Sequence, residues 1–195
     1  LPAVRVNDIE IQPQQHAVVL ATFGRAFWVL DNLQFLEQLG SAKVADDAAY
    51  LFKPQQAWLA AGGGRGGFGG GAGAENRPAG VTVFFHLPAN YEAGTPVKLS
   101  FSDAAGKVID TVSLPEKPAA GGRGGFGGGA ARRAPRLHAG MNSYQWNMRY
   151  PDAVEVKGIF HSGFSASVPV GPEIVPGTYN VTFTVGQTSE KQPFV

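Results

Sequence analysis

The chain has 195 residues, 44% of them hydrophobic, and a formal net charge of +1. It is long enough for one or two domains with a hydrophobic core, and it lacks the strong positive charge that attracts nucleic acids or anionic membranes. It contains no cysteine, which excludes disulfides, thiolate metal sites and a cysteine nucleophile. No apolar run approaches the ~20 residues of a membrane-spanning helix, so we expect no membrane span. No signal-peptide pattern follows Leu1, and the missing initiator methionine indicates a processed or trimmed product.

The first thirty residues predict up to three short strands. Residues 1–12 alternate apolar and polar side chains, with Ile9 and Ile11 among the apolar ones. The segment HAVVLATFGRAFWVLD, residues 16–31, has two apolar runs separated by Thr22–Arg25, which is the pattern of a hairpin. A lone hairpin is marginally stable in water, so these strands need a further packing partner.

A short helix is expected next, over DNLQFLEQL. Asp31 or Asn32 is suited to cap its start, and Gly40 is suited to end it. Its apolar stripe consists of Leu33, Phe35, Leu36 and Leu39. The following segment AAYLFKPQQAW is expected to be extended, because Pro54 disfavours helical geometry at the preceding residue.

Two glycine-rich tracts, residues 62–73 and 121–129, hold 16 of the 27 glycines and share the sequence GGRGGFGGGA. Such tracts bury too little apolar surface to offset their ordering entropy, so we expect mobile surface loops. Each contains one Arg-Gly-Gly-Phe unit, formed by Arg65 with Phe68 and by Arg123 with Phe126. An alternative is binding of single-stranded nucleic acid through arginine and stacking, although one unit per tract and a near-neutral charge argue against it. A third possibility is a glycine-rich arm that docks on a neighbouring subunit through its phenylalanine.

The rest of the chain shows repeated strand signals. Apolar residues alternate with polar ones in GVTVFFHL, PVKLSFSD, NSYQWNMRYP and PGTYNVTFTV, and SDAAGK has the composition of a hairpin turn from Asp103 to Gly106. The segment VIDTVSL is expected to place Val108, Asp110 and Val112 on one side. Strands of this length without strong helices between them indicate an antiparallel β-sandwich.

No residue pattern indicates catalysis, a cofactor or a metal. The four histidines lack the spacing of metal ligands, and none of the carboxylates lies within an apolar run that would raise its pKa. No serine has the surroundings of a nucleophile elbow, and no phosphate-binding Gly-Lys-Ser/Thr follows a glycine tract. We therefore assign no catalytic, cofactor-binding or metal-binding residue.

The N-terminal segment resembles the final blade of large bacterial sortilin-like, BNR-repeat β-propeller proteins, often described as glycosyl-hydrolase-like. Their closing segment has the pattern Thr-His-Gly-Arg-x-x-Trp-x-Leu-Asp, which this chain matches at Thr22, Gly24, Arg25, Trp28, Leu30 and Asp31. Phe23 replaces the usual histidine, so any role of that histidine is lost. The segments AGMNSYQWNMRYP and VPGTYNVTFTV resemble the immunoglobulin-like C-terminal domain of the same proteins. The order and spacing of the motifs cover most of the chain outside the glycine tracts.

The resemblance implies a mainly β chain in three parts. These are final propeller-blade strands and a helix in residues 1–45, a linker with a glycine tract in 46–78, and an immunoglobulin- or fibronectin-like sandwich in 79–195 with a glycine-rich insertion at about 118–135. A blade has four strands, so the preceding propeller, possibly a separate chain, would supply the missing strand and packing surface. The alternative is that the hairpin packs on the sandwich of the same chain. The residues expected to face it are Val18, Leu20, Phe27, Trp28 and Leu30.

The resemblance also implies a function. The leading hypothesis is a non-catalytic C-terminal module of a secreted, periplasmic or cell-surface bacterial protein, which closes the propeller by strand addition and burial and supports assembly, homo-oligomers included. A second hypothesis is a glycosidase-like hydrolase whose active site lies in the propeller. The third is the nucleic-acid binder considered above, although we expect no nucleic acid partner and no cofactor. Residues 65, 68, 123 and 126 are the candidate assembly or binding loops.

Overall fold

The computed structural model describes residues 3–57, 80–92, 94–114, 137–152 and 171–195. The described residues form an N-terminal unit, residues 3–44, and a C-terminal unit, which begins at Ala45. Among the described residues all strand pairings are antiparallel and one short helix is present. The prediction of a mainly β fold is confirmed.

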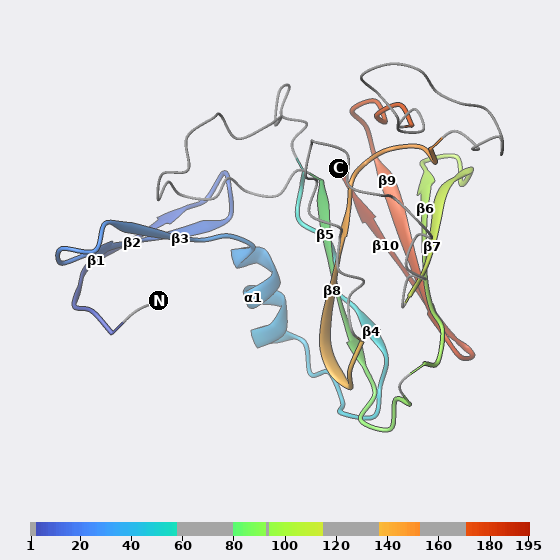
Figure 1. Ribbon diagram of the computed structural model, residues 1–195, viewed down its shortest axis with the longest axis horizontal. Coiled ribbons are helices and arrows are strands. Elements are labelled where there is room, and N and C mark those ends of the chain that lie inside the picture. Colours follow the sequence, from blue (N-terminus) through green and yellow to red (C-terminus); the bar gives the residue numbers. More distant parts are fainter. Residues whose placement is uncertain (1–2, 58–79, 93, 115–136, 153–170) are drawn as a thin grey trace, which may run out of the picture. The chain divides into compact units, whose positions relative to one another are not determined.

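The N-terminal unit contains a three-stranded sheet of order β1-β2-β3 (Figure 1). Its strands are β1 (Val6–Gln12), β2 (Ala17–Thr22) and β3 (Phe27–Leu30), and the predicted hairpin of β2 and β3 is confirmed. Only Ala17 is buried among the described residues of this unit. The sheet therefore has almost no core of its own.

The helix α1 (Leu33–Ser41) forms where it was predicted, and Asn32, one of the two predicted cap residues, is its N-cap, but the helix does not end at Gly40. Asn32 occupies the N-cap position with a φ of 64°, and its side chain makes no capping hydrogen bond. Gly40 lies within the last turn, and Ala42 is the C-cap. None of the helix residues is buried, although the sequence has an apolar stripe. Within the stripe, Leu33 and Phe35 are half-buried, whereas Leu36 and Leu39 are exposed.

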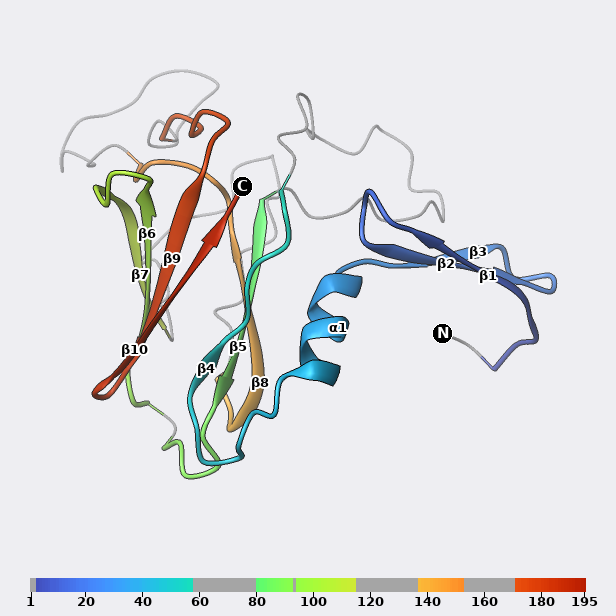
Figure 2. The ribbon, with the colours of Figure 1, turned by 180° about the vertical axis from the view of Figure 1, so that it is seen from behind.

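The C-terminal unit is a sandwich of two sheets (Figures 1 and 2). One sheet has the order β4-β5-β8, formed by β4 (Tyr50–Leu51), β5 (Val81–Leu87) and β8 (Gly140–Trp146). The other has the order β10-β9-β6-β7, formed by β6 (Val97–Asp103), β7 (Val108–Leu114), β9 (Tyr179–Val185) and β10 (Thr188–Phe194). Residues 45–57 belong to this unit, with β4 in its sheet.

Side chains from both sheets form one buried core. Phe85 lies against Phe183 with ring centroids 5.1 Å apart, and Phe101 stacks on Trp146 at 4.1 Å. The core residues follow the alternation seen in the sequence, because successive strand residues point to opposite faces. Its fully buried aliphatic and aromatic members include Leu51, Val81, Val83, Leu87, Val97, Leu99, Leu114 and Val181.

The hairpin turn at residues 103–106 is confirmed. The Gly106 N–H donates to the Asp103 carbonyl at 3.0 Å, and the Asp103 carboxylate accepts from the Lys107 N–H at 2.9 Å. The prediction that Val108 lies on the same side of β7 as Asp110 and Val112 is wrong, because Val108 is exposed and Ile109 is buried. The pairing of β6 with β7 shifts between Phe101 and Ser102, so the strict alternation is broken there.

Candidate functional site

The N-terminal sheet has one face formed mainly by apolar side chains, and Thr22 at the end of β2 lies on the same side. Residues directly opposite one another in antiparallel strands project to the same side of the sheet. Ile9 pairs with Leu20, which pairs with Trp28. Ile11 pairs with Val18, which pairs with Leu30. We call this surface the apolar face, made of Ile9, Ile11, Val18, Leu20, Trp28 and Leu30.

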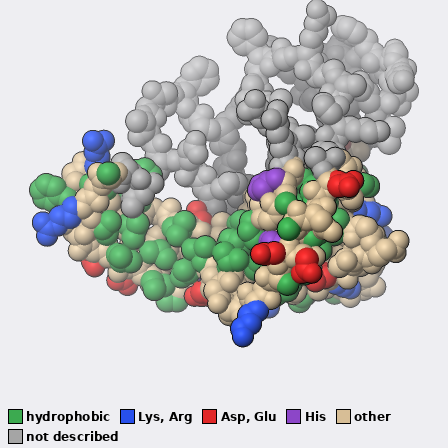
Figure 3. All heavy atoms as spheres, turned by 90° about the horizontal axis from the view of Figure 1, so that it is seen from below, with side chains coloured by type: hydrophobic (Ala, Val, Ile, Leu, Met, Phe, Trp, Pro, Cys, Tyr) green, Lys and Arg blue, Asp and Glu red, His purple; other side chains and the backbone are tan. Residues whose placement is uncertain are grey.

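The apolar face is accessible. Ile9 is 60% exposed, Ile11 55%, Trp28 40% and Leu30 48%, while Val18 and Leu20 are half-buried in the middle strand. Hydrophobic side chains gather on the surface of the N-terminal unit in Figure 3, at the left of the view. We take the apolar face as the candidate interaction site, because contiguous exposed apolar surfaces are a feature of such sites.

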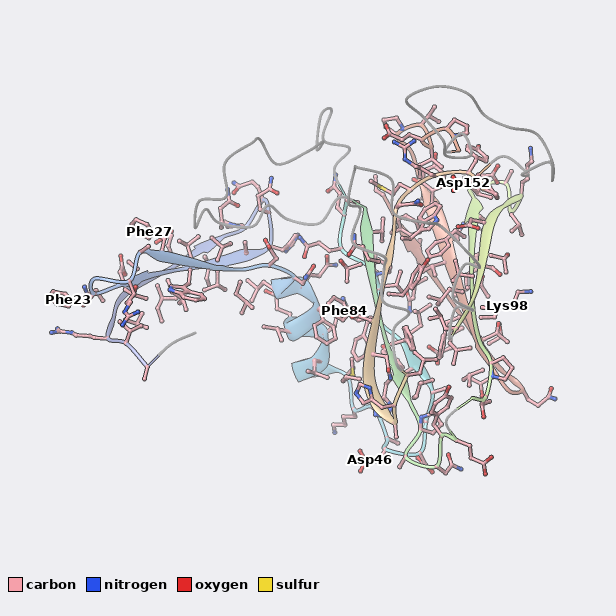
Figure 4. The ribbon with its side chains drawn as sticks, viewed as in Figure 1. Phe23, Phe27, Asp46, Phe84, Lys98 and Asp152 are labelled. Atoms are coloured by element: carbon pink, nitrogen blue, oxygen red, sulfur yellow. The ribbon has the colours of Figure 1, made fainter. Side chains whose placement is uncertain are left out.

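The opposite face of the sheet is mixed. It carries Asp8, Glu10 and Gln12 on β1, small residues and Val19 on β2, and Phe27 with Val29 on β3. Phe27 is 71% exposed, and its ring projects outward from the sheet, as does that of Phe23 (Figure 4). Of the five predicted interface residues, the structure therefore brings Val18, Leu20, Trp28 and Leu30 together on one face and places Phe27 on the other.

Hydrogen bonds within the hairpin fix the position of Trp28. Its indole N–H donates to the Arg25 carbonyl at 3.1 Å. The Ala26 carbonyl accepts from the backbone N–H and from the hydroxyl of Thr22, at 3.3 and 2.6 Å. Gly24 has a φ of 74°, a conformation in which glycine avoids the strain of a side chain. The residues of the Thr-x-Gly-Arg-x-x-Trp pattern thus build a local turn that holds the tryptophan on the apolar face.

The prediction missed two members of this surface, Ile9 and Ile11. The sequence alternation already placed them in a strand, but the register that aligns them with Leu20 and Val18 is visible only in the structure. The four candidate loop residues Arg65, Phe68, Arg123 and Phe126 lie outside the described residues.

A pocket of about 310 Å³ lies within the C-terminal unit. Desolvation raises the pKa of Tyr91 in its wall, and this phenol donates a hydrogen bond to the Thr95 carbonyl at 2.8 Å. Tyr91 is therefore held protonated and is poorly suited to act as a base or nucleophile. The lining residues are Asp47, Ala49, Pro88, Asn90, Tyr91, Glu92, Thr95, Val185, Gly186 and Thr188.

Within the described ranges, no group of three histidine, aspartate or glutamate side chains is arranged to hold a metal ion. In the same residues, no helix has the length and apolar character needed to cross a membrane. Comparisons of the chain with family models, curated proteins and solved structures gave no match. The resemblance to sortilin-like propeller proteins therefore remains a hypothesis that is supported by sequence motifs alone.

Proposed function

We propose that this chain is a non-catalytic assembly module whose apolar face packs against another β-sheet. The observation that carries the proposal is the exposure of four large side chains on that face, Ile9, Ile11, Trp28 and Leu30. The partner in this proposal is the preceding β-propeller portion of a sortilin-like protein, on the same polypeptide or as a separate chain. The parent protein is proposed to be secreted, periplasmic or at the cell surface.

Energetic reasoning supports a sheet as the partner. A three-stranded sheet gains stability by burying a hydrophobic face, and this sheet leaves its face exposed. Sheets that pack face to face lie about 10 Å apart with interdigitating side chains, and six apolar residues over three strands provide such a surface. Packing at this face would supply the core that the N-terminal unit lacks.

The C-terminal unit supports the proposal from another side. Its core is closed by its own two sheets, and its outer face carries polar residues such as Lys98, which points outward (Figure 4). We therefore assign this unit a structural role.

The test is capture between separately produced chains. The propeller portion of the parent protein would be immobilised and this 195-residue chain would be added to it. We expect binding that is lost in Leu30→Asp, because the variant places a charge within the buried contact. The matched control is Val108→Asp, which introduces the same charge at another exposed apolar strand position, on the sandwich.

Two results would contradict the proposal. The first is an absence of binding by the unmodified chain. The second is equal loss of binding in Leu30→Asp and Val108→Asp, which would show that the apolar face is not the contact. A glycan assay on the assembled protein would then test the hydrolase hypothesis.

A further inference from the structure

The backbone bonds of the N-terminal sheet show which groups reach its two open edges. In an antiparallel strand, successive residues direct their N–H and C=O groups to alternate sides. The Thr22 N–H bonds to Ala26 toward β3, and the Phe23 N–H bonds to Arg5 toward β1. The same alternation continues along β2. The N–H and C=O groups of Leu20 and Val18 therefore point toward Trp28 and Leu30 of β3. Phe27 and Val29 consequently direct their N–H and C=O groups away from β2, to the open edge of β3.

The edge formed by β1 is protected. The N–H of Ile9 points outward by the same alternation, and it donates to the Asp8 carboxylate at 2.9 Å. The β1 pairing also has an irregularity between Val6 and Asp8, and the strand carries the charged residues Asp8 and Glu10. Bulges, charges and occupied donors are the features by which edge strands avoid pairing with another chain.

The edge formed by β3 has none of these features. Its four residues, Phe27–Leu30, include no charge and no proline, and its pairing with β2 shows no irregularity. All four side chains are exposed. Within the described residues, no hydrogen bond from outside the sheet reaches Phe27 or Val29. Such an edge is a template for a further strand.

We propose that β3 pairs antiparallel with β3 of a second copy of this chain, about a twofold axis at Trp28. In this register Phe27 of each copy forms hydrogen bonds with Val29 of the other, and the two Trp28 residues lie opposite one another. This register opposes the two outward-directed residues, and it places Leu30 of each copy opposite Ala26 of the other. The cross-strand pairs are then aromatic with β-branched and aromatic with aromatic, two favourable combinations. The same register brings Arg25 of one copy and Asp31 of the other to the same end of the joined strands.

The pairing creates a continuous six-stranded sheet. Residues that oppose one another share a face, so the apolar faces of both copies lie on the same side of it. Self-pairing uses the edge of β3, whereas the proposed function uses the apolar face. The two proposals therefore stand or fall independently.

The first test blocks the edge. Val29→Pro removes an N–H that points outward, so the pairing of β3 with β2 is retained while the contact with a second copy is lost. The matched control is Ile9→Pro, which removes the outward N–H of β1. Sedimentation velocity over rising protein concentration should show a dimer for the unmodified chain and Ile9→Pro, and a monomer for Val29→Pro. An unmodified chain that stays monomeric at about 200 μM, or equal behaviour of the two proline variants, would overturn the proposal.

The second test determines the register of the β3–β3 pairing by cross-linking and uses no proline variant. The chain has no cysteine, so Trp28→Cys introduces a single thiol. Opposed residues of a non-hydrogen-bonded pair have Cα atoms about 4.5 Å apart, within the range of a disulfide. Mild oxidation should cross-link Trp28→Cys into a dimer. Leu30→Cys should stay uncross-linked, because its counterpart lies about four residues further along the partner strand. Equal cross-linking of both variants would overturn the register.

The tests separate this inference from the proposed function. Val29→Pro leaves the apolar face unchanged, so the immobilised propeller portion should still capture this variant. Capture without dimerisation would overturn self-pairing alone, and dimerisation without capture would overturn the proposed function alone.

Discussion

Leu30→Ala and Leu99→Ala make the same chemical change in two opposite environments. Leu99 is fully buried in the sandwich, whereas Leu30 is 48% exposed on the apolar face. Removing a fully buried leucine side chain leaves a cavity and costs about 2–5 kcal/mol. The Leu30 side chain is about half-buried, so it contributes about half of the roughly 2 kcal/mol that full burial would give. Its removal leaves no enclosed cavity, and the substitution should therefore cost about 1 kcal/mol. We expect the two costs to differ by at least about 1 kcal/mol.

Hydrogen exchange measured by mass spectrometry suits this comparison, because it reports on each unit separately. Peptides from β2 and β3 give the opening free energy around Leu30, and peptides from β6 and β9 give it around Leu99. A loss in Leu30→Ala as large as that in Leu99→Ala would show that the apolar face is already covered in the isolated chain. The face would then be a core, and the argument that it docks a partner would fail.

Three further predictions follow from the packing. Amides of β1–β3 should exchange much faster than those of β5, β6 and β9, because the N-terminal unit has almost no buried core, and bound propeller portion should slow them. Asp110→Ala should lower the free energy of unfolding by about 1.5–3 kcal/mol, because the Trp146 indole N–H donates to this carboxylate at 3.0 Å. Urea unfolding should show that the same substitution costs clearly less in a Trp146→Phe background. An equal cost in both backgrounds would contradict the role of this hydrogen bond. Gly80→Ala should destabilise the sandwich by at least about 2 kcal/mol in thermal unfolding, because φ is +112° and the new Cβ would lie 2.0 Å from the Trp146 carbonyl oxygen; an unchanged melting temperature would contradict that clash.

The sequence predicts the strands best where one face is buried. In β6 and β9 the apolar residues alternate without interruption, and each of them is buried in the structure. In β5 every second residue from Val81 to Leu87 is apolar and buried, and Phe84 is an additional, half-buried apolar residue on the other face. Burial of one face of a strand requires a period of two, so the pattern and the structure have the same cause. The turn from Asp103 to Gly106 was predictable for a similar reason, because local hydrogen bonds suffice to form it.

The parts that escaped prediction depend on distant residues. The strand β10 has a largely polar sequence, and it is held through β9 and through a 2.6 Å hydrogen bond from the Leu51 N–H to the Glu190 carboxylate. The alternation of β7 is displaced by the shifted pairing at Phe101 and Ser102. The apolar face needs the registers of two strand pairs, and no single segment contains that information. Asn32 fails as a side-chain cap because its own backbone adopts a left-handed conformation.

The two units use apolar residues for different purposes. In the sandwich, large apolar side chains such as Phe101 and Phe183 are completely enclosed, and they stabilise the fold of this chain directly. In the N-terminal sheet, side chains such as Trp28 are positioned by local hydrogen bonds and are left partly exposed, so part of their burial free energy is still available. A face that is locally ordered before contact loses little conformational entropy on binding, which favours association. The combination of an ordered turn and an unburied face is therefore what a docking surface requires, and a sheet that existed only to stabilise this chain would have no reason to keep it.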